Sequence, residues 1–265
     1  MGIIISGNTI SGINLNASGN SIQPNSVTRG LVGLWDAGDN ASYSNTSNYY
    51  DCGYGCQYYS SNPGCTNCNS QWKDLSGYGH DATNNNSATI TYSDTGGGAF
   101  YFNNVNTYFN ITSTSLLNPS SGVISTGVWF NSSELGTIND RILINKENEY
   151  EISAAGGYLT YAFRPNWAWV GNTAINLNQW YHVMVTYDQS YQRMYVNGVQ
   201  VYSAALTGAI GNTYANDLRI GARNAPGSPT SVFKGYIARV EIYNVALSST
   251  EVLQVFNNGR QRFGI

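Results

Sequence analysis

All four cysteines of this 265-residue chain lie in one short stretch, as two close pairs: Cys52 with Cys56, and Cys65 with Cys68. Zinc accepts cysteine pairs at such spacings, but the spacer between the pairs is short for a zinc ribbon. No Lys or Arg lies within the stretch to balance four thiolates. Nested disulfides, Cys52–Cys68 and Cys56–Cys65, would instead staple an insertion and stabilise it by about 2–4 kcal/mol. The stretch favours disulfides and leaves zinc as the alternative.

Three carboxylates alternate in "KENEYEIS", at Glu147, Glu149 and Glu151. On a strand they would share one face, with neighbours about 7 Å apart. Glycoside hydrolases use two carboxyl groups roughly 5–9.5 Å apart, so this spacing is compatible with hydrolysis. No other catalytic pattern surrounds the three residues, and neither His80 nor His182 has a serine or cysteine nucleophile beside it. We expect a non-enzymatic protein, with His182 as a strand histidine that has a hydrogen-bonded partner.

Two tryptophans, Trp167 and Trp169, alternate in "RPNWAWVGN" and are predicted to share one face of a short strand. Indole faces stack on sugar rings, and the neighbouring Arg164 and Asn166 can hydrogen-bond sugar hydroxyls. These four residues are the candidate glycan contacts. The alternative is that both rings pack in a core or against another subunit.

Four aspartates lie in two turn-like phrases: Asp36 and Asp39 in "WDAGD", and Asp74 and Asp81 in "DLSGYGHD". Calcium binds several oxygen ligands, including backbone carbonyls of such turns, so these residues form a candidate structural calcium site. The competing interpretation is that Asp and Gly simply form the turns.

The composition describes a β-rich protein with a neutral, hydrogen-bonding surface. Charged residues make up only 10% of the chain and hydrophobic residues 42%, and the net charge is −3. Without a basic run, we expect no nucleic-acid partner. The sequence holds no transmembrane-length apolar stretch and its first residues do not resemble a signal peptide, so we also expect no membrane association.

Short strands follow one another from Gly30 onward, which predicts an antiparallel sandwich. Asn197-Gly198 lies between two alternating apolar runs, a pattern typical of a type I′ hairpin. Trp35, Trp129 and Trp180 lie in strand phrases and are interpreted as packing residues.

One helix is predicted near the C-terminus. Ser248 and Glu251 form a capping-box pattern, and Gly259 is the expected end of the helix.

The strand order and several phrases resemble the laminin G type of concanavalin A-like jelly roll, as found in tailed-phage virion proteins, notably those of cyanophages. The phrases that carry the resemblance are "GLVGLWDAGDNASY", "WKDLSGYGHDAT", "LNQWYHVMVTYD", "RMYVNGVQVYS", "YIARVEIYNVALSSTEVLQVFN" and "RFGI". The cysteine stretch departs from the pattern, as an insertion at about 45–70. The resemblance implies two antiparallel sheets with a concave face, carbohydrate binding in some members and calcium in others.

These observations together predict one jelly roll over residues 30–265, preceded by a polar, Gly/Asn/Ser-rich N-terminal arm over residues 1–29. We expect a virion surface structural protein, a head decoration or fibre component, with host-surface glycans as its candidate ligands. The arm would bind other virion proteins, and the protein would form a homo-oligomer. The alternative is a carbohydrate-binding lectin or tail receptor-binding module, and a glycoside hydrolase is the less favoured third hypothesis.

Overall fold

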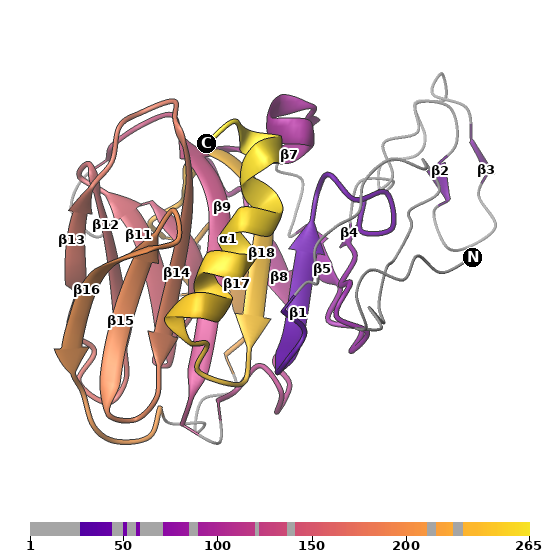
Figure 1. The fold of residues 1–265 in the computed structure, drawn as a ribbon. Helices are drawn as coiled ribbons and strands as arrows, with labels where there is room; N and C mark the ends of the chain where they lie inside the picture. Colours follow the sequence, from indigo (N-terminus) through magenta and orange to yellow (C-terminus); the bar gives the residue numbers. More distant parts are fainter. Residues whose placement is uncertain are drawn as a thin grey trace, which may run out of the picture.

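The computed structural model describes residues 27–43, 50–51, 57–58, 71–84, 90–119, 122–136, 141–210, 216–224 and 230–265. Within these residues the chain folds into two facing β-sheets with a helix at the C-terminal end (Figure 1). The cysteines at 52, 56, 65 and 68, and residues 1–26 of the predicted arm, lie outside the described residues. The disulfide and zinc hypotheses therefore stay predictions.

Sheet I has the strand order β16-β15-β14-β9-β18-β7-β6, with β1 pairing to β18, and every pairing is antiparallel. Its strands are β1 (Leu31–Asp36), β6 (Thr91–Ser93), β7 (Ala99–Asn103), β9 (Ile124–Ser132), β14 (Trp180–Tyr187), β15 (Tyr191–Val196), β16 (Val199–Ala205) and β18 (Lys234–Tyr243).

Sheet II has the order β13-β12-β11-β10-β17-β8-β5-β4 and is also antiparallel throughout. Its strands are β4 (Gln71–Trp72), β5 (Ala82–Asn84), β8 (Phe109–Ile111), β10 (Ile142–Lys146), β11 (Tyr150–Ala155), β12 (Tyr158–Phe163), β13 (Val170–Ala174) and β17 (Leu218–Ile220). A separate pair joins β2 (Tyr50–Asp51) to β3 (Gln57–Tyr58), and a short 3-10 turn, η1, spans Thr95–Gly97.

The main core lies between the two sheets and is built from alternate residues of their strands. Val183 and Val185 of β14 point into it, while Met184 between them belongs to a second cluster on the other side of sheet I. The strand is therefore buried on both faces. Trp35 is fully buried in the main core, and Trp129 packs on the other side of sheet I, so the predicted packing roles of both are confirmed.

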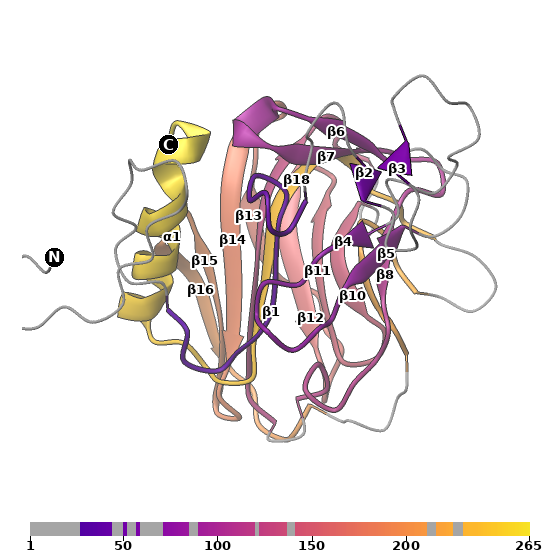
Figure 2. The same ribbon diagram turned by 90° about the vertical axis from the view of Figure 1, so that its right-hand side faces the viewer.

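Helix α1 (Ser249–Phe263) covers the outer side of sheet I, the side that faces away from sheet II (Figure 2). Phe256 and Phe263 stack on Trp129, with ring centroids 5.7 and 4.3 Å apart. Trp180 is half-buried, 4.7 Å from Phe263, in agreement with a packing role. The apolar side of the helix thus closes the second face of sheet I.

The capping box is confirmed: the Ser248 side chain accepts from the Glu251 backbone N–H, and the Glu251 side chain accepts from Ser248. The predicted helix end at Gly259 is wrong. The helix continues to Phe263, and Gly264 forms the left-handed cap with φ 71°. Gly259 instead faces Trp129, where a Cβ would lie 2.6 Å from the indole ring.

The Asn197-Gly198 hairpin is confirmed as well, because both residues have positive φ, 49° and 77°, as a type I′ turn requires. The observed architecture matches the predicted all-β jelly-roll sandwich with one C-terminal helix in the described residues. No helix among those residues is long and apolar enough to span a membrane.

Candidate functional site

A continuous row of polar side chains crosses sheet II. Residues directly opposite each other in antiparallel strands share a face of the sheet, so strand register determines which side chains line up. Each strand pairs with the next across the sheet, in the order β4, β5, β8, β17, β10 and β11. The polar row consists of Gln71, Thr83, Asn110, Arg219, Asn145 and Glu151, and it ends at Ala162 of β12.

The polar row lies on the outer face of sheet II. Its sequence neighbours point the other way: Phe109, Ile144 and Ile220 belong to the core between the sheets. Since successive residues of a strand alternate between faces, the row faces outward. Helix α1 covers the outer face of sheet I, on the opposite side of the molecule (Figure 2).

The two ends of the row differ in exposure. Gln71 and Thr83 are exposed, and Asn110 and Arg219 are half-buried. Asn145 and Glu151, by contrast, are fully buried although they face outward. An open half of the row therefore adjoins a covered half.

The segment 221–224, here called the strap, accounts for the covered half. The Asn224 backbone N–H donates to Asn145 Oδ1 at 2.7 Å. Arg223 donates from Nε and Nη2 to the two oxygens of Glu151, both at 2.9 Å, and this fork covers the carboxylate. Burial raises the pKa of Glu151 to about 7, while the Arg223 guanidinium opposes that rise.

An aromatic ring lies over the strap. The Arg223 guanidinium carbon lies 5.5 Å from the centroid of the Trp169 ring, which is half-buried. A guanidinium over an indole face is a favourable cation–π arrangement. Arg223 thus contacts both Trp169 and the Glu151 carboxylate of the sheet.

Arg219, at the middle of the row, has unused hydrogen-bonding capacity. Its guanidinium lies 4.4 Å from the Tyr108 ring centroid and donates from Nη1 to the Arg223 carbonyl at 3.1 Å. Its Nε is buried without a partner, and the described residues place no carboxylate within ion-pair distance. Burial lowers the pKa of Arg219. The Arg219 side chain is only half-buried, and within the described residues its terminal nitrogens donate no hydrogen bond beyond the one to Arg223, so they are where a ligand can add an acceptor.

Of the four candidate glycan contacts, Trp169 reaches this face through its contact with Arg223. The two tryptophans do not alternate on a strand, as the sequence predicted: Trp167 lies in the turn before β13 with φ 50°, and β13 begins after Trp169. The turn is shaped by Asn166, whose side chain accepts from the Ala168 N–H. Arg164 lies at the start of the same turn and is half-buried.

The three glutamates do not share one strand face, and that prediction is wrong. Glu147 and Glu149 lie in the turn between β10 and β11, where Asn148 has a φ of 64°, and only Glu151 lies on a strand. Glu147 accepts from the Asn145 side chain at 3.1 Å. Glu149 is fully buried beside Lys146, 3.5 Å away, and burial raises its pKa to about 7.

The four candidate calcium aspartates all bond to groups of the protein. Asp36 accepts from the Gly38 N–H and from Arg262. Asp39 accepts from the Ala41 N–H, and Asp81 accepts from the Asp74 N–H and pairs with Lys73. In the described part of the chain, three or more Asp, Glu, His or Cys side chains do not gather as a metal site. Calcium stays a prediction, while the observed bonds support the turn-forming interpretation.

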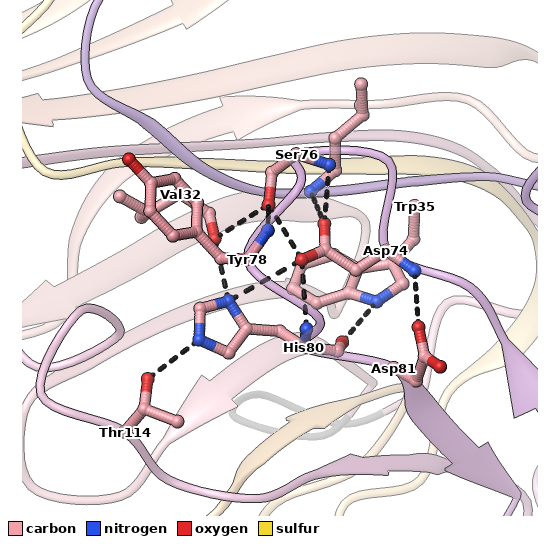
Figure 3. A network of polar contacts seen from close by, with 9 residues as sticks. Val32, Trp35, Asp74, Ser76, Tyr78, His80, Asp81 and Thr114 are labelled. Atoms are coloured by element: carbon pink, nitrogen blue, oxygen red, sulfur yellow. Dashed lines mark hydrogen bonds and ion pairs between the residues drawn. The ribbon is translucent and has the colours of Figure 1, made fainter.

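Asp74 is the centre of a polar network that ties the loop 73–81 to β1 (Figure 3). Its buried carboxylate accepts from the Leu34 N–H at 3.0 Å and the His80 N–H at 3.0 Å. It also accepts from the Ser76 N–H at 2.8 Å and the Ser76 hydroxyl at 2.7 Å. Four donors on one carboxylate make this a structural clasp.

The two histidines are structural. His80 Nδ1 lies 2.8 Å from the Val32 carbonyl, which can only accept, so Nδ1 carries the proton; Nε2 lies 2.9 Å from the Thr114 hydroxyl (Figure 3). The His182 ring, expected to have a hydrogen-bonded partner, has none: both ring nitrogens are buried and unpaired, and the ring stacks on Trp129 at 4.7 Å. Burial lowers the pKa of His182 to about 3, so the ring is neutral.

Comparisons with known proteins agree with the fold. The Laminin_G_3 family model, described as the concanavalin A-like lectin/glucanases superfamily, matches residues 103–253, more than half of the chain. The chain belongs to this superfamily. No curated protein sequence matches it.

Solved structures share the fold at low sequence identity. Domain 4 of AbnA, a GH43 extracellular arabinanase from Geobacillus stearothermophilus, solved in complex with arabinotriose, has a TM-score of 0.56 and 19% identity over 85% of this chain and 97% of that one. The binding domain of botulinum neurotoxin DC in complex with SialylT has a TM-score of 0.54 and 14% identity over 70% of this chain and 48% of that one. The binding domain of Paraclostridial Mosquitocidal Protein 1 scores 0.55 at 19% identity, over 70% and 49%. The chain spans about half the length of these toxin domains.

Proposed function

We propose that this protein is a non-enzymatic carbohydrate-binding module whose glycan site is the open half of the polar row. The observation that carries the proposal is the row itself, which aligns an amide, a hydroxyl, a second amide and a guanidinium on one exposed sheet face. Sugar hydroxyls both donate and accept hydrogen bonds, so such a mixed row suits them. Neighbours of the same fold that were solved in complex with arabinotriose and with SialylT lend support.

Two polar side chains of the row are held in place and keep hydrogen-bonding groups that a ligand can use. The Asn110 side-chain N–H₂ donates to Asp217 at 2.8 Å, which fixes the amide and leaves its carbonyl oxygen to accept from a ligand. Arg219 lies flat on Tyr108 and donates one hydrogen bond within the described residues. Both side chains are therefore held in place before a ligand arrives, which lowers the entropic cost of binding.

The carboxylates support a binding role rather than hydrolysis. Glu151 is fully buried in the Arg223 fork, and Glu149 is fully buried beside Lys146. Neither can reach a glycosidic bond without losing its partner. We therefore propose that the protein has no glycosidase activity, which a reducing-sugar assay on the substrates named below would test.

The finer proposal is that the module is displayed on a virion surface, with the N-terminal arm as its anchor. Val27 packs with Val252 of α1, and Arg29 pairs with Glu251 at 2.8 Å. Val27, the first described residue, therefore lies beside α1, on the side opposite to the polar row. This arrangement would leave the glycan face pointing away from whatever holds the arm.

Deletion of residues 1–26 tests the anchoring role. We expect the shortened protein to fold and bind glycans as the full chain does, but not to enter particles. Incorporation of the shortened protein at the full-chain level would contradict the anchoring proposal while leaving glycan binding intact, as expected for a free lectin or tail receptor-binding module.

The binding function is tested with the full chain on a panel of arabinan, xylan, mannan, β-glucan, dextran, hyaluronan and polygalacturonate, with calcium and again with EDTA. We expect saturable binding that Arg219→Ala weakens roughly three- to tenfold, the value of one hydrogen bond. Arg193→Ala is the matched control, because Arg193 lies on β15 of sheet I and is also half-buried. Absence of binding by well-folded protein, or equal loss in both variants, would overturn the proposal; loss with EDTA alone would place calcium at the site.

A further inference from the structure

The polar row is closed at one end, so a glycan chain that lies along it would have to end there. On the basis of the proposed glycan site, we propose that the row binds the terminus of a glycan chain, over about three sugar residues, rather than the middle of a long polysaccharide. Three features of the row indicate a chain terminus: its open half is short, the strap closes one end, and unused donors lie beside the strap.

The open half crosses four neighbouring strands, β4, β5, β8 and β17. Neighbouring strands lie about 4.8 Å apart, so its three steps span about 14 Å, comparable to about three pyranose rings in line. Gln71 stands at the far end and Arg219 beside the strap. A glycan lying along the row would cross the strands and place successive sugars over successive positions.

The strap prevents such a glycan from continuing. Beyond Arg219 the next two positions of the row are fully buried: Asn145 beneath the Asn224 backbone and Glu151 beneath Arg223. These are main-chain and bidentate contacts of 2.7–2.9 Å, and the Arg223 guanidinium also lies over the Trp169 ring. A ligand cannot displace them without exposing a carboxylate that has already been paired.

The hydrogen-bonding groups that a terminal sugar needs gather at the closed end. Arg219 Nη1 bonds to the carbonyl of Arg223, which places the two arginines next to each other. Nε and Nη2 of Arg223 are both committed to Glu151, whereas Nη1 donates no hydrogen bond in the described residues. The first sugar would thus meet two guanidinium groups, and the last of the three would meet only Gln71.

Isothermal titration of the full chain with oligosaccharides of one to six residues tests the length. The probes are arabino-, cello-, laminari- and malto-oligosaccharides. We expect affinity to rise up to about three residues and then to stay level, because longer chains gain no further contacts along the 14 Å row. Affinity that keeps rising to six residues would overturn this inference and leave the proposed function standing. Failure of every length, together with failure of the polysaccharide panel, would overturn both.

Two variants test whether the terminal sugar lies at Arg219 and the third sugar at Gln71. Gln71→Ala should weaken the trisaccharide roughly three- to tenfold and leave the disaccharide unchanged, whereas Asn110→Ala should weaken both. Gln71 is exposed and, among the described residues, its side chain accepts only from Lys73, so the variant should fold normally. An equal effect of Gln71→Ala on both lengths would contradict a fixed terminus at Arg219.

End-blocked trisaccharides complete the test. One probe carries a bulky fluorophore at the reducing end, and the other carries a branch at the non-reducing end. We expect one of the two modifications to abolish binding and the other to be tolerated. If both modified probes bind as well as the free trisaccharide, the row is open at both ends and the inference is wrong.

Discussion

Lys146, at the end of β10, and Glu149, in the turn before β11, are two fully buried ionisable side chains. Lys146 donates to the Asn216 carbonyl at 2.6 Å and to the Ser113 hydroxyl at 3.1 Å. Within the described residues neither oxygen of Glu149 accepts a hydrogen bond, and the charges of Lys146 and Arg164 only partly offset the cost of burying the carboxylate. Burial therefore raises the pKa of Glu149 to about 7 and lowers the pKa of Lys146.

This pair makes the free energy of unfolding depend on pH. Between about pH 4.5 and 7 the folded protein keeps a proton on Glu149 that the unfolded chain releases, so stability should fall as the pH rises through this window. Glu151, whose pKa is also raised to about 7, adds to the fall. In Glu149→Gln the fall should be smaller, by on the order of 1–3 kcal/mol.

Urea unfolding at pH 5 and at pH 8 measures the effect. At pH 5 the variant should match the wild type closely, because Gln resembles the protonated acid. An unchanged difference between the two pH values would show that Glu149 is ionised in the folded protein across this range.

Asp74 gives the second prediction at this scale. Its carboxylate accepts four hydrogen bonds and is fully buried, so Asp74→Ala leaves several donors unpaired. We expect a loss of about 3–5 kcal/mol in the free energy of unfolding. Asp39→Ala is the control, since Asp39 is exposed and accepts a single N–H; it should cost less than about 1 kcal/mol. Equal losses in thermal or urea unfolding would contradict the clasp.

At the scale of single elements, α1 shows what the sequence can and cannot give. The capping box was predictable because Ser248 and Glu251 interact with each other and with their own backbone. The packing role of Gly259 was not predictable, because it depends on Trp129, which lies on strand β9. Gly259 is small to let the helix approach the indole, and Gly264 ends the helix instead.

Gly259→Ala tests this packing role. Alanine favours a helix over glycine by about 1 kcal/mol, yet its Cβ would lie 2.6 Å from Trp129. We expect the clash to dominate and the variant to lose about 1–3 kcal/mol of stability. Asn257→Ala, on the exposed side of the same helix, should be neutral or slightly stabilising. A more stable Gly259→Ala protein in thermal unfolding would show that the helix can shift away from the sheet.

The misplaced tryptophans and glutamates have a common physical cause. Both predictions assumed that alternating residues continue a strand, but Asn148 and Trp167 adopt positive φ and turn the chain. Asn tolerates this conformation well, so "ENE" was readable as a turn in principle. Trp rarely adopts it, and its conformation depends on surrounding contacts that no local pattern reveals.

At the scale of the whole molecule, the sandwich has two different outer faces. One is closed by α1, whose apolar residues were recognisable from their helical pattern. The other carries the polar row, which was not predictable, because it depends on pairings among β5, β8, β17 and β10, which are neighbours in the sheet but not in the sequence. Single alternations such as "LRI" indicate that Arg219 points outward, but strand order and register alone bring it beside Asn110.

The central claim is that glycans bind the outer face of sheet II. The most direct measurement is a ¹H–¹⁵N spectrum of the full chain titrated with the trisaccharide that binds best among arabinotriose, cellotriose, laminaritriose and maltotriose. We expect shifts at the Gln71 and Asn110 side-chain amides and at the backbone of Thr83 and Arg219, with β14–β16 and α1 unchanged. Shifts confined to sheet I or to α1 would contradict the claim.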